Sequence, residues 1–138
     1  MSERVVLKSN DSRNVYPSNK TYDFRVHLPK PLQFLGNWEV SLTEFTYQGA
    51  KKSVEPELLI CCDLVDDGIV GDREEPLLRR VFLNRRLENL IFEQPYAVHL
   101  KTGIFQDVHV YIKTFKHELA SFLTGQVTVT LQFKRVFF

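Results

Sequence analysis

The segment at residues 36–45 most constrains how this chain can fold. Within it, Trp38, Val40 and Leu42 fall on one side of an extended backbone, and polar residues occupy the positions between them. Apolar residues at every second position are typical of a β-strand with one buried face. The apolar phase changes near the end of the segment, and a β-bulge near Thr43 would account for that change. We therefore expect a long strand whose tryptophan lies in the core.

Similar patterns predict further strands along the whole chain. Together with the tryptophan strand, they lie at residues 4–8, 22–28, 57–65, 77–83, 91–100, 105–113 and 126–134. The strand at 22–28 should end at Pro29 and Pro31, because proline cannot donate to a strand ladder. The strand at 57–65 is apolar on both faces, which predicts a central position in its sheet. Proline at position 95 interrupts the strand at 91–100.

The remaining segments read as connections. The stretches at 9–21 and 48–56 are rich in turn-forming and polar residues and predict loops. We expect residues 66–68 to turn, 69–76 to connect two strands, 84–90 to form a turn or a short helix, and 116–124 to form a helical turn or a long loop. About eight strands without a sustained helical period predict an all-β domain: a sandwich, a jelly roll or a barrel.

Length and composition agree with one domain spanning residues 1–138. A chain of 138 residues buries roughly two-thirds of its unfolded surface, and 43% hydrophobic and 12% aromatic residues supply a core. The formal net charge of +1 predicts no general attraction to nucleic acid. The first residues show no secretion signal, and no apolar run approaches the length of a membrane span. We expect a soluble protein that is made inside the cell and not secreted, with no membrane span.

Cys61 and Cys62 are adjacent, and this spacing disfavours a disulfide between them. Two cysteines alone are also too few ligands for a metal site. Because strand side chains alternate, one thiol should point into the core and the other outward. Free cysteines fit a reducing compartment. The glycosylation patterns that begin at Asn10 and Asn19 are expected to be turn residues, since no secretion signal is seen.

The polar residues do not predict an enzyme. The four histidines, at positions 27, 99, 109 and 117, form no close metal-ligand motif, and His27 and His109 are expected on the solvated surface. The acidic residues at 63–72 suit a turn better than a calcium loop. No nucleophile or phosphate-loop motif is present. We therefore predict no catalytic, cofactor-binding or metal-binding residues, no cofactor and no small-molecule substrate.

Two features leave alternatives open. Arg79, Arg80, Arg85 and Arg86 are either surface charges with ion-pair partners or contacts for a neighbouring protein or nucleic acid. Residues 137–138 are both phenylalanine, and they either fold back onto the core or dock into a partner.

A series of short motifs, densest over residues 7–45, gives the chain a family resemblance. In order they are Leu7-Lys8-Ser9-Asn10-Asp11-Ser12, Tyr16-Pro17-Ser18-Asn19, Leu28-Pro29, Trp38-Glu39-Val40, Cys62-Asp63-Leu64-Val65, Ile69-Val70-Gly71-Asp72, Pro76-Leu77-Leu78-Arg79 and the strand at 125–133. This order resembles the minor capsid (penton) proteins of Polinton (Maverick) elements and adintovirus-like sequences, which also occur as transposon-derived proteins in animal genomes. The chain departs from the pattern at Gln48, where proline is expected, and this departure leaves the turn after the tryptophan strand undecided.

The resemblance implies a single jelly roll that assembles as a pentamer at the vertices of an icosahedral shell. It also implies a double jelly-roll major capsid protein as partner and the virion as location, after synthesis in the host cytoplasm or nucleus. The alternative on the same fold is a receptor- or glycan-binding module of viral or host-adopted origin.

Overall fold

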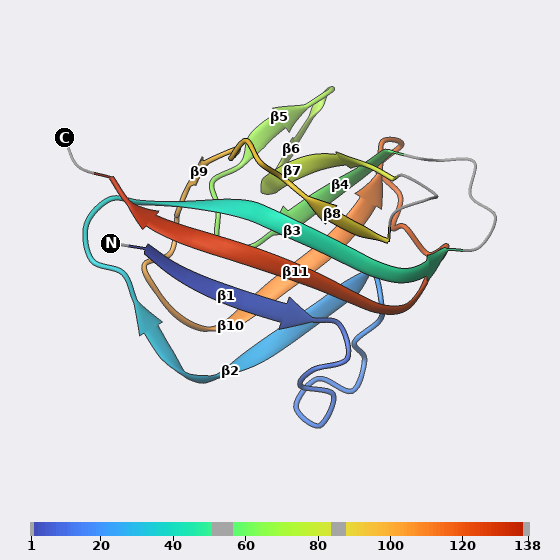
Figure 1. The fold of residues 1–138 in the computed structure, drawn as a ribbon, viewed down its shortest axis with the longest axis horizontal. Coiled ribbons are helices and arrows are strands. Elements are labelled where there is room, and N and C mark those ends of the chain that lie inside the picture. Colours follow the sequence, from blue (N-terminus) through green and yellow to red (C-terminus); the bar gives the residue numbers. More distant parts are fainter. Residues whose placement is uncertain (1, 51–56, 84–87, 137–138) are drawn as a thin grey trace.

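The computed structural model describes residues 2–50, 57–83 and 88–136, and it confirms the prediction of an all-β sandwich. Eleven strands are present within these residues (Figure 1). The first sheet contains, in order, β1 (Ser2–Lys8), β11 (Leu123–Arg135), β3 (Trp38–Ala50) and β8 (Asn89–Ile91), with β9 (Val98–His99) paired to another part of β3. The second sheet contains β2 (Asp23–Gln33), β10 (Ile104–Thr114), β4 (Glu57–Cys62) and β7 (Leu77–Phe82).

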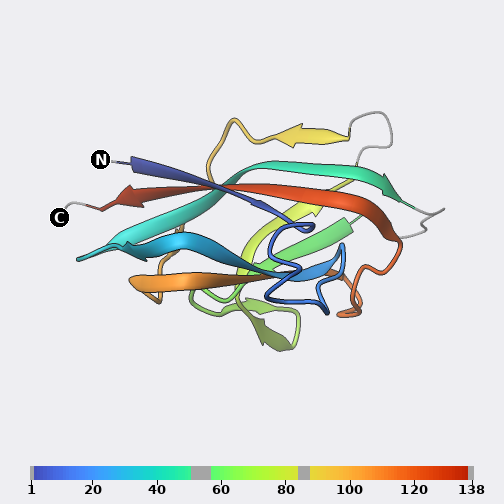
Figure 2. The ribbon, with the colours of Figure 1, turned by 90° about the horizontal axis from the view of Figure 1, so that it is seen from below.

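The eight principal strands pair as one long hairpin folded over on itself. The first, β1, pairs with the last, β11, and β2 pairs with β10. Inside these pairs, β3 pairs with β8 and β4 pairs with β7, all antiparallel. Seen from the side, the two sheets form two layers (Figure 2). The nesting also brings both ends of the chain to the same end of the sandwich (Figure 1).

Trp38 lies in the core between the sheets, as its alternation predicted. It packs against Phe34, with ring centroids 4.6 Å apart, and Phe34 in turn stacks on Phe133 at 4.8 Å. The indole N–H donates a hydrogen bond of 2.8 Å to the carbonyl of Leu35. The one polar atom of the side chain is therefore satisfied, which burial of an indole requires.

The predicted bulge at Thr43 is also confirmed. On β11, Leu131 pairs with Leu42 and the preceding Thr130 pairs with Glu44, so Thr43 is an extra residue on β3. One extra residue reverses the alternation, because side chains point to opposite faces in turn. The bulge thereby returns Phe45 to the core, where it is fully buried.

The prediction that Pro29 and Pro31 end their strand is wrong, because β2 continues to Gln33. The strand lies at an edge of its sheet. Its pairing with β10 shifts at this point, so that residues 28–31 lie opposite Gln106 alone. Edge strands and bulges tolerate proline because its missing N–H is not needed by the ladder there.

Other boundaries differ from the prediction in smaller ways. The loop expected at 48–56 begins later, since β3 runs through Gln48 to Ala50; residues 51–56 are outside the described part. The connection expected at 69–76 is mostly a hairpin of β5 (Gly68–Val70) and β6 (Arg73–Glu75). The segment at 91–100 is divided between β8 and β9. Residues 115–122 form a loop, and of the segment at 84–90 only 88–90 are described.

Candidate functional site

The β5–β6 hairpin lies against the outer face of the second sheet, away from the core (Figure 2). Glu75 of the hairpin fixes it there. Its carboxylate accepts a hydrogen bond of 2.8 Å from Lys113 Nζ and one of 3.3 Å from the Tyr111 hydroxyl, both on β10. Only 6% of Glu75 is exposed, so these partners compensate a nearly buried charge.

The electrostatics of this contact agree with its geometry. Burial alone would raise the pKa of Glu75, but the hydrogen bond and positive charge of Lys113 outweigh it and hold that pKa below its usual value. Burial, with the nearby negative groups, raises the pKa of Tyr111. The pair Glu75–Lys113 is therefore an ion pair that holds the hairpin on the sheet at neutral pH.

The two cysteines alternate as predicted, one into the core and one outward, but the hairpin buries the outward one as well. Cys62 points into the main core as one of the two thiols should. Cys61 points outward from the sheet, yet it is also fully buried, because it packs with Leu59 and Val70 in a second small cluster beneath the hairpin. Burial raises the pKa of Cys61 to about 12 and raises that of Cys62 as well. Both thiols are free.

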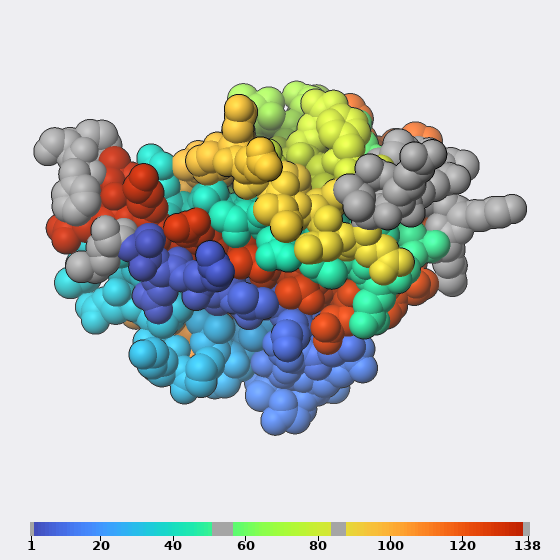
Figure 3. Space-filling model, viewed as in Figure 1, coloured from blue at the N-terminus to red at the C-terminus, as the bar shows by residue number. Residues whose placement is uncertain are grey.

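A groove of about 420 Å³ lies beside the hairpin. It is lined by Leu59, Ile69, Val70, Gly71, Leu77, Arg79, Arg80, Tyr96 and Phe115. These residues come from β4, the hairpin, β7, the segment before β9 and the residue after β10. In the space-filling view, the hairpin projects at the upper rim of the molecule beside the segment that carries β8 and β9 (Figure 3). Three apolar side chains at the groove stay open to solvent: Ile69 is 82% exposed, Tyr96 54% and Phe115 47%.

Two of the four predicted arginines line this groove. The guanidinium of Arg79 lies 4.1 Å from the ring centroid of Phe92 and donates to the carbonyl of Gln94 at 2.9 Å. Arg80 forms an ion pair with Glu57. Its guanidinium also lies 5.4 Å from the ring centroid of Phe115.

Arg79 and Arg80 therefore have partners within the chain, and as consecutive residues of β7 they pair with Ile60 and Leu59, whose side chains lie on opposite faces of the sheet. Arg85 and Arg86, like the phenylalanines at 137–138, lie outside the described residues.

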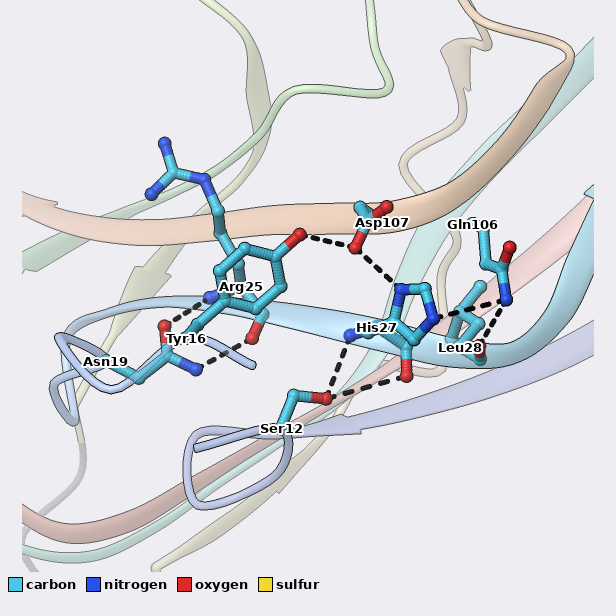
Figure 4. A network of polar contacts seen from close by, with 8 residues as sticks. All are labelled: Ser12, Tyr16, Asn19, Arg25, His27, Leu28, Gln106 and Asp107. Atoms are coloured by element: carbon cyan, nitrogen blue, oxygen red, sulfur yellow. Dashed lines mark hydrogen bonds and ion pairs between the residues drawn. The ribbon is translucent and has the colours of Figure 1, made fainter. Parts of the chain in front are cut away.

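The histidines at positions 27 and 109 contact carboxylates, which their predicted place on the solvated surface did not include. His109 is only half-exposed and lies 2.6 Å from a carboxylate oxygen of Asp23, so the expectation of a fully solvated residue is wrong for it. His27 is on the surface as expected, but its Nδ1 lies 2.9 Å from Asp107. Tyr16 donates a hydrogen bond to the same carboxylate (Figure 4).

The same close-up shows that the loop at 9–21 lies along the open edge of β2 (Figure 4). Asn19 forms hydrogen bonds with both the N–H and the carbonyl of Arg25. The hydroxyl of Ser12 accepts from the N–H of His27. These side chains thus form hydrogen bonds with backbone groups of β2 that would otherwise have no partner at the edge of the sheet. The residues expected only to form turns therefore also cap a sheet edge.

Comparison with protein-family models and with curated proteins gave no match for this chain. Within residues 2–50, 57–83 and 88–136, no group of three His, Cys, Asp or Glu side chains could hold a metal ion. The described part of the chain also contains no helix with the length and apolar character of a membrane span.

The arginines and histidines are recognisable in the sequence, but the groove is not. Its lining residues come from five separate segments between positions 59 and 115, and no local pattern joins them. The available signal was the apolar outer position of Leu59 and Cys61 on a strand with two apolar faces. That pattern indicates a second covered surface, although it does not identify the covering segment.

Proposed function

We propose that this protein is a structural minor capsid (penton) protein of a virus or a virus-like transposon, with a single jelly-roll fold and no enzymatic activity. In this proposal it assembles as a pentamer at icosahedral vertices, next to a double jelly-roll major capsid protein, and its location is the virion. The motif order over residues 7–45 supports the family, and the strand pairing supports the fold.

The observation that carries the proposal is the nested pairing of eight strands. In an eight-stranded jelly roll, two four-stranded sheets form from a folded-over hairpin, and consecutive strands pass back and forth between the sheets. Here β1 and β3 are in the first sheet, whereas β2 and β4 are in the second. Almost the whole described chain belongs to this sandwich and its connections, which suits a building block whose function depends on its surfaces.

A ring of identical subunits needs two different complementary surfaces on each copy. Its contacts are head-to-tail, so one patch meets another patch and the rotation closes the ring. Exposed apolar side chains are candidates for such contacts, and they come from separate segments of the chain: Leu35, Phe82, Ile91 and Ile104. Loops at either end of the sandwich offer further contact surface (Figure 1).

The alternative of a glycan-binding module has less support from the geometry. Sites of that kind would place carboxylate or amide groups beside an exposed aromatic ring. The groove does contain Tyr96, but its charged lining residues are Arg79 and Arg80, and its lining includes no carboxylate or amide side chain. The groove therefore favours a contact with a protein surface over a sugar.

Electron microscopy of the purified protein tests the proposal. Class averages should show rings with five-fold symmetry, and mixing with a double jelly-roll major capsid protein should place those rings at the vertices of shells. A protein that remains as single particles of one chain, alone and in that mixture, would contradict the proposal. Binding to sugars on a glycan array in the absence of rings would instead support the alternative.

A further inference from the structure

We propose that the outer edge of β1 accepts an extended acidic segment of another protein chain, which adds to the first sheet as a further strand. The segment carries two carboxylates with one apolar side chain midway between them. This inference concerns one edge of the sandwich, and it does not depend on the proposed function.

The strand β1 is the outermost strand of the first sheet, where β11 is its neighbour (Figure 1). Just beyond β1, the N–H of Ser9 donates to the carbonyl of Val127 at 2.8 Å. Because successive residues of an antiparallel strand direct their backbone groups to opposite sides, odd positions of β1 face β11 and even positions face outward. The backbone groups of Arg4 and Val6 therefore point away from the sheet. No hydrogen bond from the described part of the chain reaches them.

The edge of β2 shows how this chain closes an edge when it does so. Each of its three outward-facing residues bonds through its backbone to the loop at 9–21: Asp23, Arg25 and His27. Among the described residues, no such segment lies along β1. In the space-filling view, the dark-blue atoms of β1 are at the surface (Figure 3). The edge of β1 is therefore available to pair with another chain.

The exposed side chains along this edge carry positive charge. Leu7 is fully buried and Val5 packs against the core, so the side chains at even positions are on the outer face of the sheet. Three of these are Arg4, Val6 and Lys8, and all three are exposed. The edge thus presents an apolar side chain between two cations.

The neighbouring strand does not neutralise these cations. The residues of β11 that pair with positions 4, 6 and 8 are all uncharged: Gln132, Thr130 and Thr128. Within the residues that the structure describes, neither Arg4 nor Lys8 forms an ion pair. Opposite charges directly across two strands stabilise their pairing. An added strand therefore gains by placing a carboxylate opposite each cation and an apolar side chain opposite Val6.

The same charges argue against a second copy of this chain as the occupant. Side chains that meet across two paired strands must be on the same face of the sheet, so even positions would meet even positions. Antiparallel registers that overlap over most of β1 then place Arg4 opposite or diagonal to Arg4 or Lys8 of the other copy. Like charges at these positions are destabilising, whereas an acidic segment makes the same contacts attractive.

A library of short random peptides displayed on phage provides the probe, with the full-length chain as the target. Enriched sequences should carry Asp or Glu at positions i and i+4, with a β-branched apolar residue at i+2. Enrichment without this spacing, or no enrichment, would overturn the inference. Displacement of the selected peptide by a single-stranded oligonucleotide would also overturn it, because the edge would then be a site for a polyanion.

Amide hydrogen exchange measured by NMR separates strand addition from a purely ionic contact. The amides of Val5 and Leu7 face β11 and should be protected with or without the peptide. Those of Arg4 and Val6 are open to water and should become protected when the selected peptide binds. Binding without that protection would contradict pairing along β1. Protection of the same two amides at high protein concentration without peptide would show that a second copy occupies the edge, and would also overturn the proposal.

Two lysine variants test the charge, with fluorescence anisotropy of the labelled peptide as the measurement. Lys8→Glu should weaken binding by about threefold to tenfold, because a cross-strand attraction becomes a repulsion. Lys30→Glu is the matched control, since Lys30 is also an exposed lysine on an edge strand but belongs to β2. Equal losses for both variants would show that only net charge matters and would contradict the assignment.

A compensating change in the peptide completes the test. Replacing one of its two carboxylates by lysine should restore binding to the Lys8→Glu variant, because the cross-strand pair is then attractive again. No recovery with either replacement would contradict a cross-strand contact at Lys8. Circular dichroism of each variant shows that the sheets are intact.

Discussion

The carboxamide of Asn19 forms two hydrogen bonds with the backbone of Arg25: Oδ1 accepts from the N–H at 2.8 Å, and Nδ2 donates to the carbonyl at 2.7 Å. Arg25 is on β2, an edge strand, where such groups are open to pairing with another chain. The asparagine thus takes the place of a neighbouring strand at this position. The loop at 9–21 is therefore part of what keeps the sandwich from associating through this edge.

Asn19→Ala should lower the free energy of unfolding by about 1 kcal/mol, since the freed groups of Arg25 can bind water. It should also increase non-specific association, because the edge of β2 becomes available. Urea denaturation measures the first effect and size-exclusion chromatography the second. Asn14→Ala, an exposed asparagine in the same loop, is the control and should change neither. Equal behaviour of the two variants would contradict the capping role.

Trp38→Ala should destabilise the fold by about 3–5 kcal/mol, because it removes a buried ring from the aromatic cluster and leaves a cavity. Trp38→Phe keeps most of the ring but removes the N–H that bonds to Leu35. We expect that variant to lose clearly less stability than Trp38→Ala. Denaturant unfolding followed by circular dichroism compares them, and a small loss for Trp38→Ala would show that the tryptophan is not an essential core residue.

The pKa of Asp107 is lowered by hydrogen bonds from Tyr16 and His27. A carboxyl with a lowered pKa in the folded state adds stability above its unfolded pKa of about 3.9, and this contribution is lost as the pH falls through the lowered value. Tyr16→Phe removes the larger of the two hydrogen bonds' effects on the pKa of Asp107. The pKa should therefore rise, and Asp107 should contribute less to the stability of the fold above about pH 4. Carboxyl titration by NMR reports the pKa directly. An unchanged titration of Asp107 would mean that Tyr16 does not bond to it in solution.

Cys61 and Cys62 should react very slowly with iodoacetamide at neutral pH, since both are buried and their thiol pKa values are raised. Glu75→Gln weakens the attachment of the hairpin to Lys113 and should expose Cys61 selectively. Mass spectrometry of digested protein then assigns the modified thiol. Modification of Cys62 first, or of both at equal rates, would show that the hairpin does not protect Cys61.

How far the sequence predicts this structure depends on whether the relevant contacts are local. Trp38, Val40 and Leu42 were placed in the core correctly, and so was the bulge at Thr43, because alternation along one strand records which face is buried. The continuation of β2 through Pro29 was missed. Proline is excluded only where its N–H would be needed, and that depends on the position of the strand in the sheet.

The burial of Cys61 and the groove were missed for a related reason. The cysteine faces away from the core, and its cover comes from a hairpin that Glu75 attaches to Lys113, 38 positions farther along the chain. Acidic residues near a turn predicted only the turn. Neither the partner of Glu75 nor the groove can be read from a local pattern, because both depend on how separate strands pack.

The mass of the protein in solution tests the central claim most directly, and native mass spectrometry or light scattering measures it. A penton protein should form a particle of five chains, each of 16.2 kDa, over a range of protein and salt concentrations. A mass of a single chain at every concentration, with no change on addition of a double jelly-roll major capsid protein, would contradict the proposed function.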